Sequence, residues 1–337
     1  MSALPEPTLH VVLTCTKRKR KSAPDALQLR SYPEGSLDTR LQAWMQALER
    51  TAAPAVSVQD LYAGDHWQVG GSLPALASAQ GITACLWVCS AGYGLIPLEA
   101  RIVPYSATFS RGHADSVWRA GDSMSAPEAV RRWWEGLGAW VGPSPDAPRT
   151  LQALAAQDPG AGIWVVASPT YLDAMREDLV EAAGTLERRD SLVLISAGTD
   201  RLEGLEENLL RFDWRLQGSA GPLGGAAMSL NVRVAQLLLK GGWEASTAAL
   251  NRRVAALASG IPPRQPKVGE RVPPERVEEF VRRELALNPV ARATPLLRKL
   301  RDGLGWAFEE KRFRRLVEMV RSEHHRQGAS DTAEMVR

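Results

Sequence analysis

Four short, largely apolar runs that lack Asp, Glu, Lys and Arg constrain the fold of this chain more than any other feature. They cover residues 9–14, 84–89, 162–167 and 191–195 of the 337. Uncharged runs of this length are typical of strands that are buried on both faces of a sheet. Segments with helical spacing lie around them, among them residues 37–50, 115–141, 151–157, 230–239 and 274–287. The alternation predicts an α/β fold, a three-layer sandwich with a largely parallel sheet.

Small polar residues follow each of the four runs. The four endings are Cys15-Thr16, Ser90-Ala91-Gly92, Ser168-Pro169-Thr170 and Ser196-Ala197-Gly198. Because parallel strands bring their carboxyl ends to one edge of a sheet, we expect these endings to line a shared pocket for a small ring or a nucleotide. A tight turn without a ligand is the alternative for any one of them. The candidate substrate contacts at this edge are Ser90, Tyr93, Gly94, Tyr105, Ser168 and Ser196.

A run of cations comes directly after the first apolar run. Residues 17–21 read KRKRK, and their place puts them at the same edge as the predicted pocket. Phosphate groups of a nucleic acid are suitable partners for such a run, and a solvated loop is the alternative. The candidate phosphate contacts here are Lys17, Arg18 and Lys19.

The segment VSVQDLYAGDHW, residues 56–67, predicts a short strand followed by a helix over residues 64–80. Asp65 lies where that helix begins, so it could cap the helix or place a carboxylate beside a ligand. The other candidate residues of this segment are Asp60, Tyr62 and Trp67.

Two common nucleotide-binding motifs are missing from the sequence. The glycine-rich segment 218–233 lacks the Lys-Ser/Thr pair of a phosphate-binding P-loop, and the first apolar run is not followed by GxGxxG. These absences argue against an NTPase and against a dinucleotide-dependent enzyme. Asn231, near the start of the next predicted helix, could cap that helix or present its amide to a base edge.

Cysteine content and hydropathy limit the class of protein. The three cysteines, Cys15, Cys85 and Cys89, fit a reduced cytoplasmic protein, and their spacing does not form a zinc knuckle. No apolar run in the sequence is close to the length of a membrane-spanning helix, which needs about 18 apolar residues. The N-terminus lacks the pattern of a secretory signal. We therefore expect a cytoplasmic protein with no membrane partner, no metal and no cofactor.

The C-terminal part differs in composition from the rest. Residues 1–260 are expected to form the α/β domain, 261–274 a proline-rich linker, and 275–330 a basic helical domain. Between residues 282 and 326 there are twelve Lys and Arg against six Asp and Glu. Three helices with a glycine turn predict a helix-turn-helix DNA reader, and a charged surface helix is the alternative. The candidate phosphate contacts are Arg298, Lys311, Arg312, Arg314 and Arg315.

Three motifs in order, LTCTKRK, DLYAGDHW and VCSAGYGLIPLEARIVPY, resemble a family of YaaA-like and DpdC-like proteins that are linked to DNA. The resemblance covers residues 9–109, and the implied architecture is similar to that of uracil-DNA glycosylases. It implies functional positions at Cys15, Thr16, Lys17, Asp60, Tyr62, Gly64, Ser90, Ala91, Gly94, Leu95, Pro104 and Tyr105. The Gln-Asp-Pro-Tyr loop of uracil-DNA glycosylases is absent, so its catalytic carboxylate cannot be transferred to this chain.

The resulting hypothesis is a metal-independent DNA glycosylase that excises a modified base from phage DNA in antiviral defence, glucosylated hydroxymethylcytosine being one such base. Asp65 or Asp60 would stabilise the oxocarbenium-like sugar or orient water. Tyr105, Tyr93 or Trp67 would stack on the extruded base, and Asn231 would read its edge. Two alternatives stay open: an enzyme that edits a 7-deazaguanine base without cutting the glycosidic bond, and a DNA-binding protein without catalysis.

Overall fold

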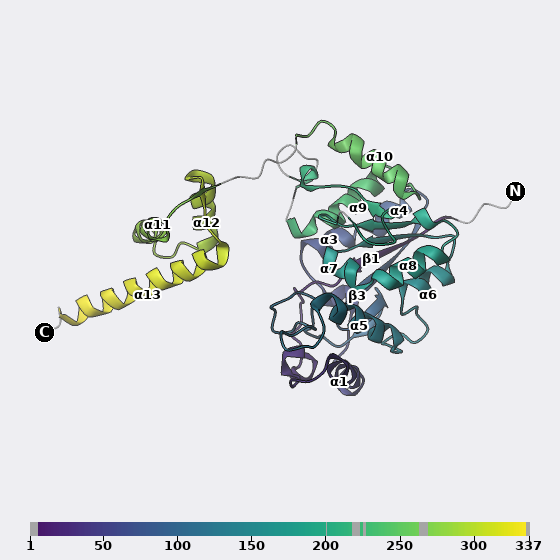
Figure 1. Cartoon of the computed structure of the whole chain (residues 1–337), viewed down its shortest axis with the longest axis horizontal. Coiled ribbons are helices and arrows are strands. Elements are labelled where there is room, and N and C mark those ends of the chain that lie inside the picture. The colour runs from purple at the N-terminus through teal and green to yellow at the C-terminus, as the bar shows by residue number, and fades with distance from the viewer. Residues whose placement is uncertain (1–5, 200, 218–222, 225–226, 263–268, 335–337) are drawn as a thin grey trace. The chain divides into compact units, whose positions relative to one another are not determined.

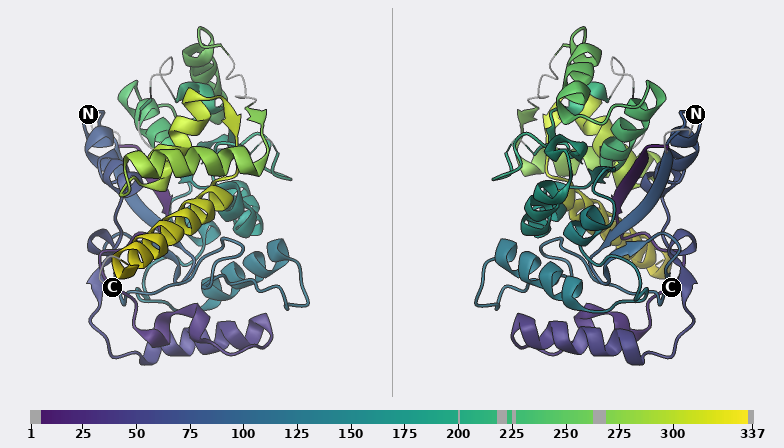
Figure 2. Two further views of the ribbon diagram at one scale, coloured as in Figure 1. Left: turned by 90° about the vertical axis from the view of Figure 1, so that its left-hand side faces the viewer. Right: turned by 90° about the vertical axis from the view of Figure 1, so that its right-hand side faces the viewer.

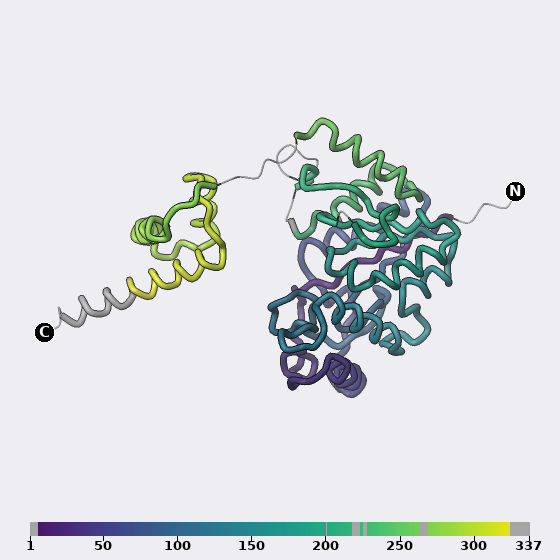
Figure 3. Tube along the Cα trace, viewed as in Figure 1, coloured from purple at the N-terminus to yellow at the C-terminus, as the bar shows by residue number. Residues whose placement is uncertain are grey.

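The computed structural model describes residues 6–199, 201–217, 223–224, 227–262 and 269–334. Contacts along the chain divide it into two compact units, Met1–Pro263 and Arg264–Arg337. We call them the α/β unit and the C-terminal unit, and each is described by itself (Figures 1 and 3). Residues 263–268 of the predicted linker, and residues 218–222 and 225–226 of the glycine-rich segment, lie outside the described residues.

A six-stranded sheet organises the α/β unit, with the strand order β4-β3-β1-β6-β7-β8. Its strands are β1 (Thr8–Thr14), β3 (Thr83–Ser90), β4 (Gly94–Pro97), β6 (Gly162–Val166), β7 (Leu192–Ile195) and β8 (Leu209–Leu210). All neighbours are parallel except β4, which pairs with β3 in the antiparallel sense. The α/β class and the largely parallel sheet are therefore confirmed.

Strand β1 is the point at which the sheet changes its direction of growth. The chain passes from β1 to its neighbour β3, and later returns to place β6 on the other side of β1. In open α/β sheets, ligands bind outside the carboxyl ends of the strands at such a point. Cys15, the first residue after β1, lies at this position.

The helices around the sheet fall into three sets, and the helices within each set contact one another. The first set is α3 (Asp65–Gly70), α4 (Leu73–Ser78) and α9 (Leu230–Lys240), of which α4 packs on β3 and α9 on β6 and β7. The second set is α1 (Leu37–Arg50), α5 (Ala126–Ala139) and α7 (Pro169–Ala174), and the third is α6 (Leu151–Gln157) with α8 (Arg176–Thr185). Helix α1 lies beside α5 in both views of Figure 2. The remaining elements of this unit include β2 (Val56–Ser57), α2 (Val58–Leu61), β5 (Arg101–Ile102) and α10 (Thr247–Ala258).

Two helix predictions were wrong in their bounds. The predicted helix over residues 64–80 is two helices, because Gly71 and Ser72 separate α3 from α4. The predicted helix over 115–141 begins only at Ala126, where Ser125 and Glu128 form a capping box. The preceding residues form turns, and the Asp122 carboxylate is held by Arg40 Nη2 at 2.7 Å. The buried ion pair between Asp122 and Arg40 stabilises the turns of residues 115–125 more than the helical spacing of that segment favours a helix.

The antiparallel β3–β4 hairpin was not predicted, although its glycines were noted. Gly94 has a φ of 73°, a conformation that glycine adopts without strain. A Cβ atom on Gly92 would lie 2.4 Å from Cδ2 of Tyr105, so only glycine allows this close approach. The hairpin thus depends on both glycines for different reasons.

The C-terminal unit has a hydrophobic core of its own. It comprises β9 (Glu270–Arg271), α11 (Pro274–Leu287), α12 (Ala293–Arg298), a π-helical turn (Lys299–Gly303), β10 (Trp306–Ala307) and α13 (Glu310–Glu334). Phe313 and Val317 of α13 belong to one buried cluster with Val277 and Phe280 of α11. Strands β9 and β10 pair in parallel beside the helices. The helix-turn-helix arrangement stays a prediction.

Helices that combine the length and the apolarity needed to cross a membrane are absent from the described ranges.

Candidate active site at the carboxyl edge of the sheet

Six side chains at the carboxyl ends of β1, β3 and β6 form a connected polar group, which we call the edge cluster. Its members are Cys15, Lys19, Tyr62, Ser90, Tyr105 and Tyr171, and a hydrogen bond between Cys15 and Tyr105 joins the Cys15–Tyr171 pair to the rest. The Tyr171 hydroxyl lies 3.0 Å from Cys15 Sγ. The Ser90 hydroxyl donates to the Tyr105 hydroxyl at 2.7 Å, and the Tyr105 and Tyr62 hydroxyls lie 2.8 Å apart. Predicted contacts Ser90, Tyr105 and Tyr62 are therefore brought together.

Strand pairing explains why residues far apart in sequence meet here. β1 and β3 run in parallel register, and the Cys15 amide continues the ladder by donating to the Cys89 carbonyl at 2.9 Å. Ser90, the last residue of β3, also accepts from the amide nitrogens of Gly92 and Tyr93, at 3.2 and 3.0 Å. The serine hydroxyl thus fixes the turn and joins it to the phenol group of Tyr105.

Lys19 belongs to the edge cluster and not to the exposed cations. Its Nζ lies 4.2 Å from the centre of the Tyr105 ring and donates to the Thr16 carbonyl at 3.3 Å. Desolvation lowers the pKa of Lys19, against the attraction of Cys15 and Asp115. The prediction that Lys19 contacts phosphate at the surface does not fit this placement. Lys17 and Arg18 are exposed, as that role requires.

The phenol groups of the edge cluster are neutral hydrogen-bonding groups. Burial raises the pKa values of Tyr62, Tyr105 and Tyr171 well above the ordinary value for tyrosine. Burial also raises the pKa of Tyr93, whose hydroxyl donates to the Val103 carbonyl at 3.0 Å. The phenol groups of the cluster are therefore neutral at pH 7, and they can both donate and accept hydrogen bonds.

The aromatic rings predicted to stack on a base are buried. Tyr93 is 2% exposed, Tyr105 1% and Trp67 8%, and Tyr62, another candidate substrate contact, is 1% exposed. Tyr62 and Trp67 stack on each other, with ring centres 4.8 Å apart. Lys19 covers the Tyr105 ring. As folded, these rings offer no open face to a base, which corrects the predicted stacking role.

A second polar group, which we call the α3–α9 cluster, contains Asp65, His66, Trp67 and Arg233. Arg233 Nη2 of α9 lies 2.6 Å from Asp65 Oδ1 at the start of α3. The preceding Ala63 amide donates to the Arg18 carbonyl at 3.0 Å, so the cation loop after β1 lies against this segment. Asp65 is thereby positioned beside the loop that continues from Cys15.

Among the described residues, three polar atoms of the α3–α9 cluster are buried and have no hydrogen-bond partner: His66 Nε2, Trp67 Nε1 and Arg233 Nε. Buried polar atoms in folded proteins are nearly always paired with protein or water. Desolvation lowers the pKa of His66 to about 4 even though the nearby Asp65 opposes this shift, so the imidazole is neutral at pH 7. Three unpaired polar atoms beside a carboxylate mark a place where a polar ligand group or a water can bind.

Asn231 holds the sheet edge together. Its Oδ1 accepts from the Ala197 amide at 2.9 Å, and its Nδ2 donates to the Ala167 carbonyl at 2.7 Å. These bonds join the turns after β6 and β7, so the amide is not directed to a base edge as predicted. Ser196 is buried and accepts from the Thr199 hydroxyl at 2.9 Å, whereas Ser168 is exposed at the start of α7.

The structure separates the two candidate carboxylates. Asp60 is exposed on α2, and its Oδ2 accepts from the Ser57 hydroxyl at 2.7 Å. This bond directs the Asp60 carboxylate to the cap of its own short helix. Gly94 serves the hairpin and faces Arg149, not a ligand. Asp65, next to Arg233, is therefore the better candidate for chemistry.

Sequence reasoning missed four residues of these clusters as site residues. Cys15 was noted as part of a strand ending and through the family resemblance, and His66 only as an imidazole beside Asp65, while Tyr171 and Arg233 were not assigned roles. Tyr171 is the residue directly after the third strand ending, Ser168-Pro169-Thr170, so the reasoning that selected Ser168 could also have selected Tyr171. Arg233 had no local signal, because its importance arises from a contact with a residue 168 positions earlier.

Groups of three or more His, Cys, Asp or Glu placed to hold a metal ion are absent from the part of the chain that the structure describes. Comparison with protein-family models, with curated proteins and with solved structures returns no match to this chain. The resemblance to YaaA-like and DpdC-like proteins therefore stays a prediction.

Proposed function

We propose that the chain is a DNA glycosylase that hydrolyses the N-glycosidic bond of a modified nucleobase. The observation that supports this best is the Asp65 carboxylate, which Arg233 holds at 2.6 Å beside a neutral histidine. The loop with exposed Lys17 and Arg18 lies against this segment, because the Ala63 amide donates to the Arg18 carbonyl. A carboxylate near a cationic loop is what a reaction on a nucleotide sugar requires.

The proposed reaction breaks the bond between C1′ and the base and forms a bond between C1′ and the oxygen of water. Asp65 stabilises the positive charge that develops on the sugar, or orients the water. Arg233 acts as a positioning residue, because it fixes the carboxylate from α9. One proton of the water ends on the departing base, and the neutral His66 beside Asp65 can take part in that transfer.

The proposal also covers the layers of the α/β unit, the contact with duplex DNA and the target base. It is supported by the alternation of strands and helices and by the cations of the C-terminal unit. The α/β unit forms a three-layer sandwich, and the C-terminal unit grips duplex phosphates through a helix-turn-helix arrangement. Exposed Lys311, Arg312, Arg314 and Arg315 on α13 support such a grip. The target is a modified base of phage DNA, such as glucosylated hydroxymethylcytosine, and the reaction takes place in the cytoplasm.

One observation favours a second function, the editing of a 7-deazaguanine base without bond cleavage. Cys15 Sγ lies 3.0 Å from the Tyr171 hydroxyl, and the Lys19 ammonium is attracted to it. A thiol beside a cation and a phenol is suited to act as a nucleophile on a polarised ring. Editing would change the mass of the base and leave the backbone free of abasic sites.

The test incubates the protein with modified and with unmodified phage DNA, followed by alkali to cut abasic sites. We expect alkali-labile sites only in modified DNA. Asp65→Asn should lower base release by about 100- to 1000-fold, the range found when one stabilising group of a transition state is removed. Asp38→Asn is the matched control, because Asp38 also pairs with an arginine but on the exposed surface. Full activity of Asp65→Asn, or a base of altered mass without strand cutting, would contradict the proposal.

A further inference from the structure

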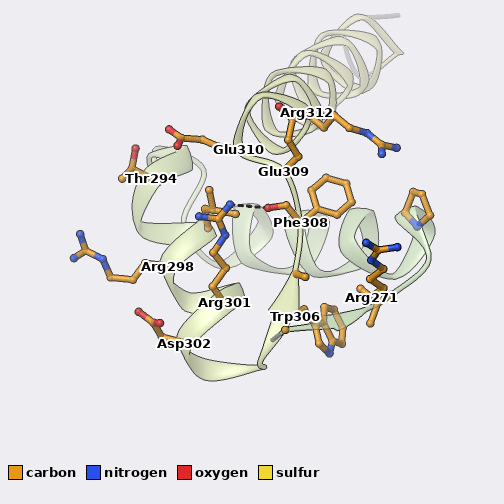
Figure 4. A pocket seen from close by; sticks show the side chains of 15 residues that line it. Arg271, Thr294, Arg298, Arg301, Asp302, Trp306, Phe308, Glu309, Glu310 and Arg312 are labelled. Atoms are coloured by element: carbon orange, nitrogen blue, oxygen red, sulfur yellow. Dashed lines mark hydrogen bonds between the residues drawn. The ribbon is translucent and has the colours of Figure 1, made fainter. Parts of the chain in front are cut away.

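A cavity of about 1130 Å³ lies within the C-terminal unit, outside the clusters described above. Its walls come from β9, α12, the π-helical turn, β10 and the start of α13 (Figure 4). This volume is slightly above the range of about 300–1,000 Å³ that is typical of ligand sites. The cavity therefore has room for more than a single small group.

Four arginines line this cavity, which we call the arginine pocket: Arg271, Arg298, Arg301 and Arg312. Each comes from a different element, and each side chain is exposed. Among the described residues none of the four forms an ion pair, whereas Arg282 and Arg314 of the same unit pair with glutamates at 2.6 Å. Arg301 Nη2 donates to the Phe308 carbonyl at 2.7 Å and so stays fixed at the wall. The four labelled side chains lie at different points around the cavity in Figure 4, and guanidinium groups without an ion-pair partner among the described residues favour an anionic ligand.

Two aromatic rings share the cavity with the arginines. Trp306 and Phe308 are alternate residues of an extended segment, so their side chains point to the same face. Both rings are half-buried. The Arg276 guanidinium lies 5.0 Å from the Trp306 ring centre, and that of Arg312 lies 5.4 Å from the Phe308 ring centre. Rings that are held by cations and still partly open can stack on a planar group.

We propose that the arginine pocket binds unpaired nucleotides of a single DNA strand, with phosphates on the arginines and a base on Trp306 or Phe308. Bases in a duplex are stacked on both sides, so only an unpaired base can offer its face to a ring inside a cavity. This inference rests on the proposed function, because it takes DNA as the ligand. It adds that the C-terminal unit holds an opened strand and does not only grip duplex phosphates.

The carboxylates at the same wall favour a nucleotide over an acidic peptide. Asp302, Glu309 and Glu310 line the cavity with the arginines, and Glu310 pairs with Arg314. Carboxylates accept hydrogen bonds from the amino group of cytosine. These carboxylates repel phosphate as they repel acidic side chains, so the preference for a nucleotide rests on the base, whose amino group they can bind and whose face the rings can stack on. The pocket therefore offers cations for the phosphates, aromatic rings for the face of a base, and carboxylates for the edge of the base.

The test measures binding of the full-length protein to a labelled single strand of about 12 nucleotides, a length within the range of single-strand sites. Fluorescence anisotropy is recorded between about 50 and 200 mM salt. Trp306→Leu should weaken binding by about 5- to 100-fold, because one stacked base is lost. Trp306→Phe keeps a ring and should restore most of the affinity. Trp214→Leu is the matched control, since Trp214 is an exposed tryptophan of the α/β unit.

Arg298→Ala gives a second readout that does not depend on the packing of Trp306. It should weaken single-strand binding and lower the slope of log affinity against log salt by about 0.7. Equal affinity for single strand and duplex, wild-type binding by Trp306→Leu, or equal competition by polyglutamate would overturn the inference. Base release is measured separately on modified duplex. Single-strand binding without base release would refute the proposed function alone, and base release with Trp306-independent binding would refute the inference alone.

Discussion

The edge cluster and the arginine pocket are both rich in polar groups, but they differ in where those groups find partners. In the edge cluster, Ser90, Tyr62 and Tyr105 bond to one another and are at most 1% exposed. In the arginine pocket, four exposed guanidinium groups have no ion-pair partner among the described residues. Partners inside the protein make a group part of the fold, because its loss leaves a buried polar atom unsatisfied. Groups without such partners are available to a ligand.

This comparison predicts that changes near the sheet edge alter stability, whereas changes in the C-terminal unit alter binding. The largest effect concerns His66, whose pKa of about 4 lies below the ordinary 6.5. Between these two values the unfolded chain binds more protons than the folded one, so stability rises with pH. The free energy of unfolding is therefore unaffected by the protonation of His66 above pH 6.5. It decreases by about 3 kcal/mol in total as the pH falls from 6.5 to 4.

Urea unfolding at a series of pH values checks this prediction. His66→Gln should flatten the pH dependence over that window, because the titrating group is gone. His113→Gln is the control, since His113 is also a histidine whose pKa desolvation lowers, but with much less burial. Parallel curves for wild type and His66→Gln would show that His66 does not titrate as proposed.

A smaller loss of stability is expected for Gly92→Ala. The added Cβ would lie 2.4 Å from the Tyr105 ring, which is buried and cannot move away without breaking its bonds to Tyr62 and Ser90. Overpacking of this kind costs about 1–3 kcal/mol. Gly184→Ala in α8 is the control, because nothing lies within 4 Å of its added Cβ. That change should leave stability equal or higher. If both variants unfold at the same urea concentration, the close approach at Gly92 is not a constraint.

The smallest effect on stability is expected in the C-terminal unit. Arg315 is exposed on α13, so Arg315→Ala should change the free energy of unfolding by no more than about 0.5 kcal/mol. The same change should reduce the salt dependence of duplex binding by about 0.9 in the logarithmic slope, because one phosphate contact is lost. Arg188→Ala, at an exposed arginine of the α/β unit, should leave that slope unchanged. A slope that is unaffected by Arg315→Ala would remove α13 from the DNA contact.

The spacing of apolar residues was sufficient to predict a helix or a strand where the segment's own sequence determines its structure. Helix α1 spans Leu37–Arg50 as predicted, because its apolar residues recur at helical spacing and Ser36 caps it. The four buried strands and their common edge followed in the same way from uncharged runs with small polar endings. The α5 start was misplaced, because the turns before it depend on Arg30 and Arg40, which come from about 80 residues earlier.

Within the candidate site, the sequence by itself determined which polar residues reach the carboxyl edge, since strand direction and length are encoded locally. Only the tertiary structure decided what those residues do there. It turned Lys19 onto the Tyr105 ring, used the Asn231 amide to join two turns, and paired Asp65 with Arg233. Each choice depends on which distant group desolvates or bonds the side chain, and that information is carried by packing and not by spacing along the chain.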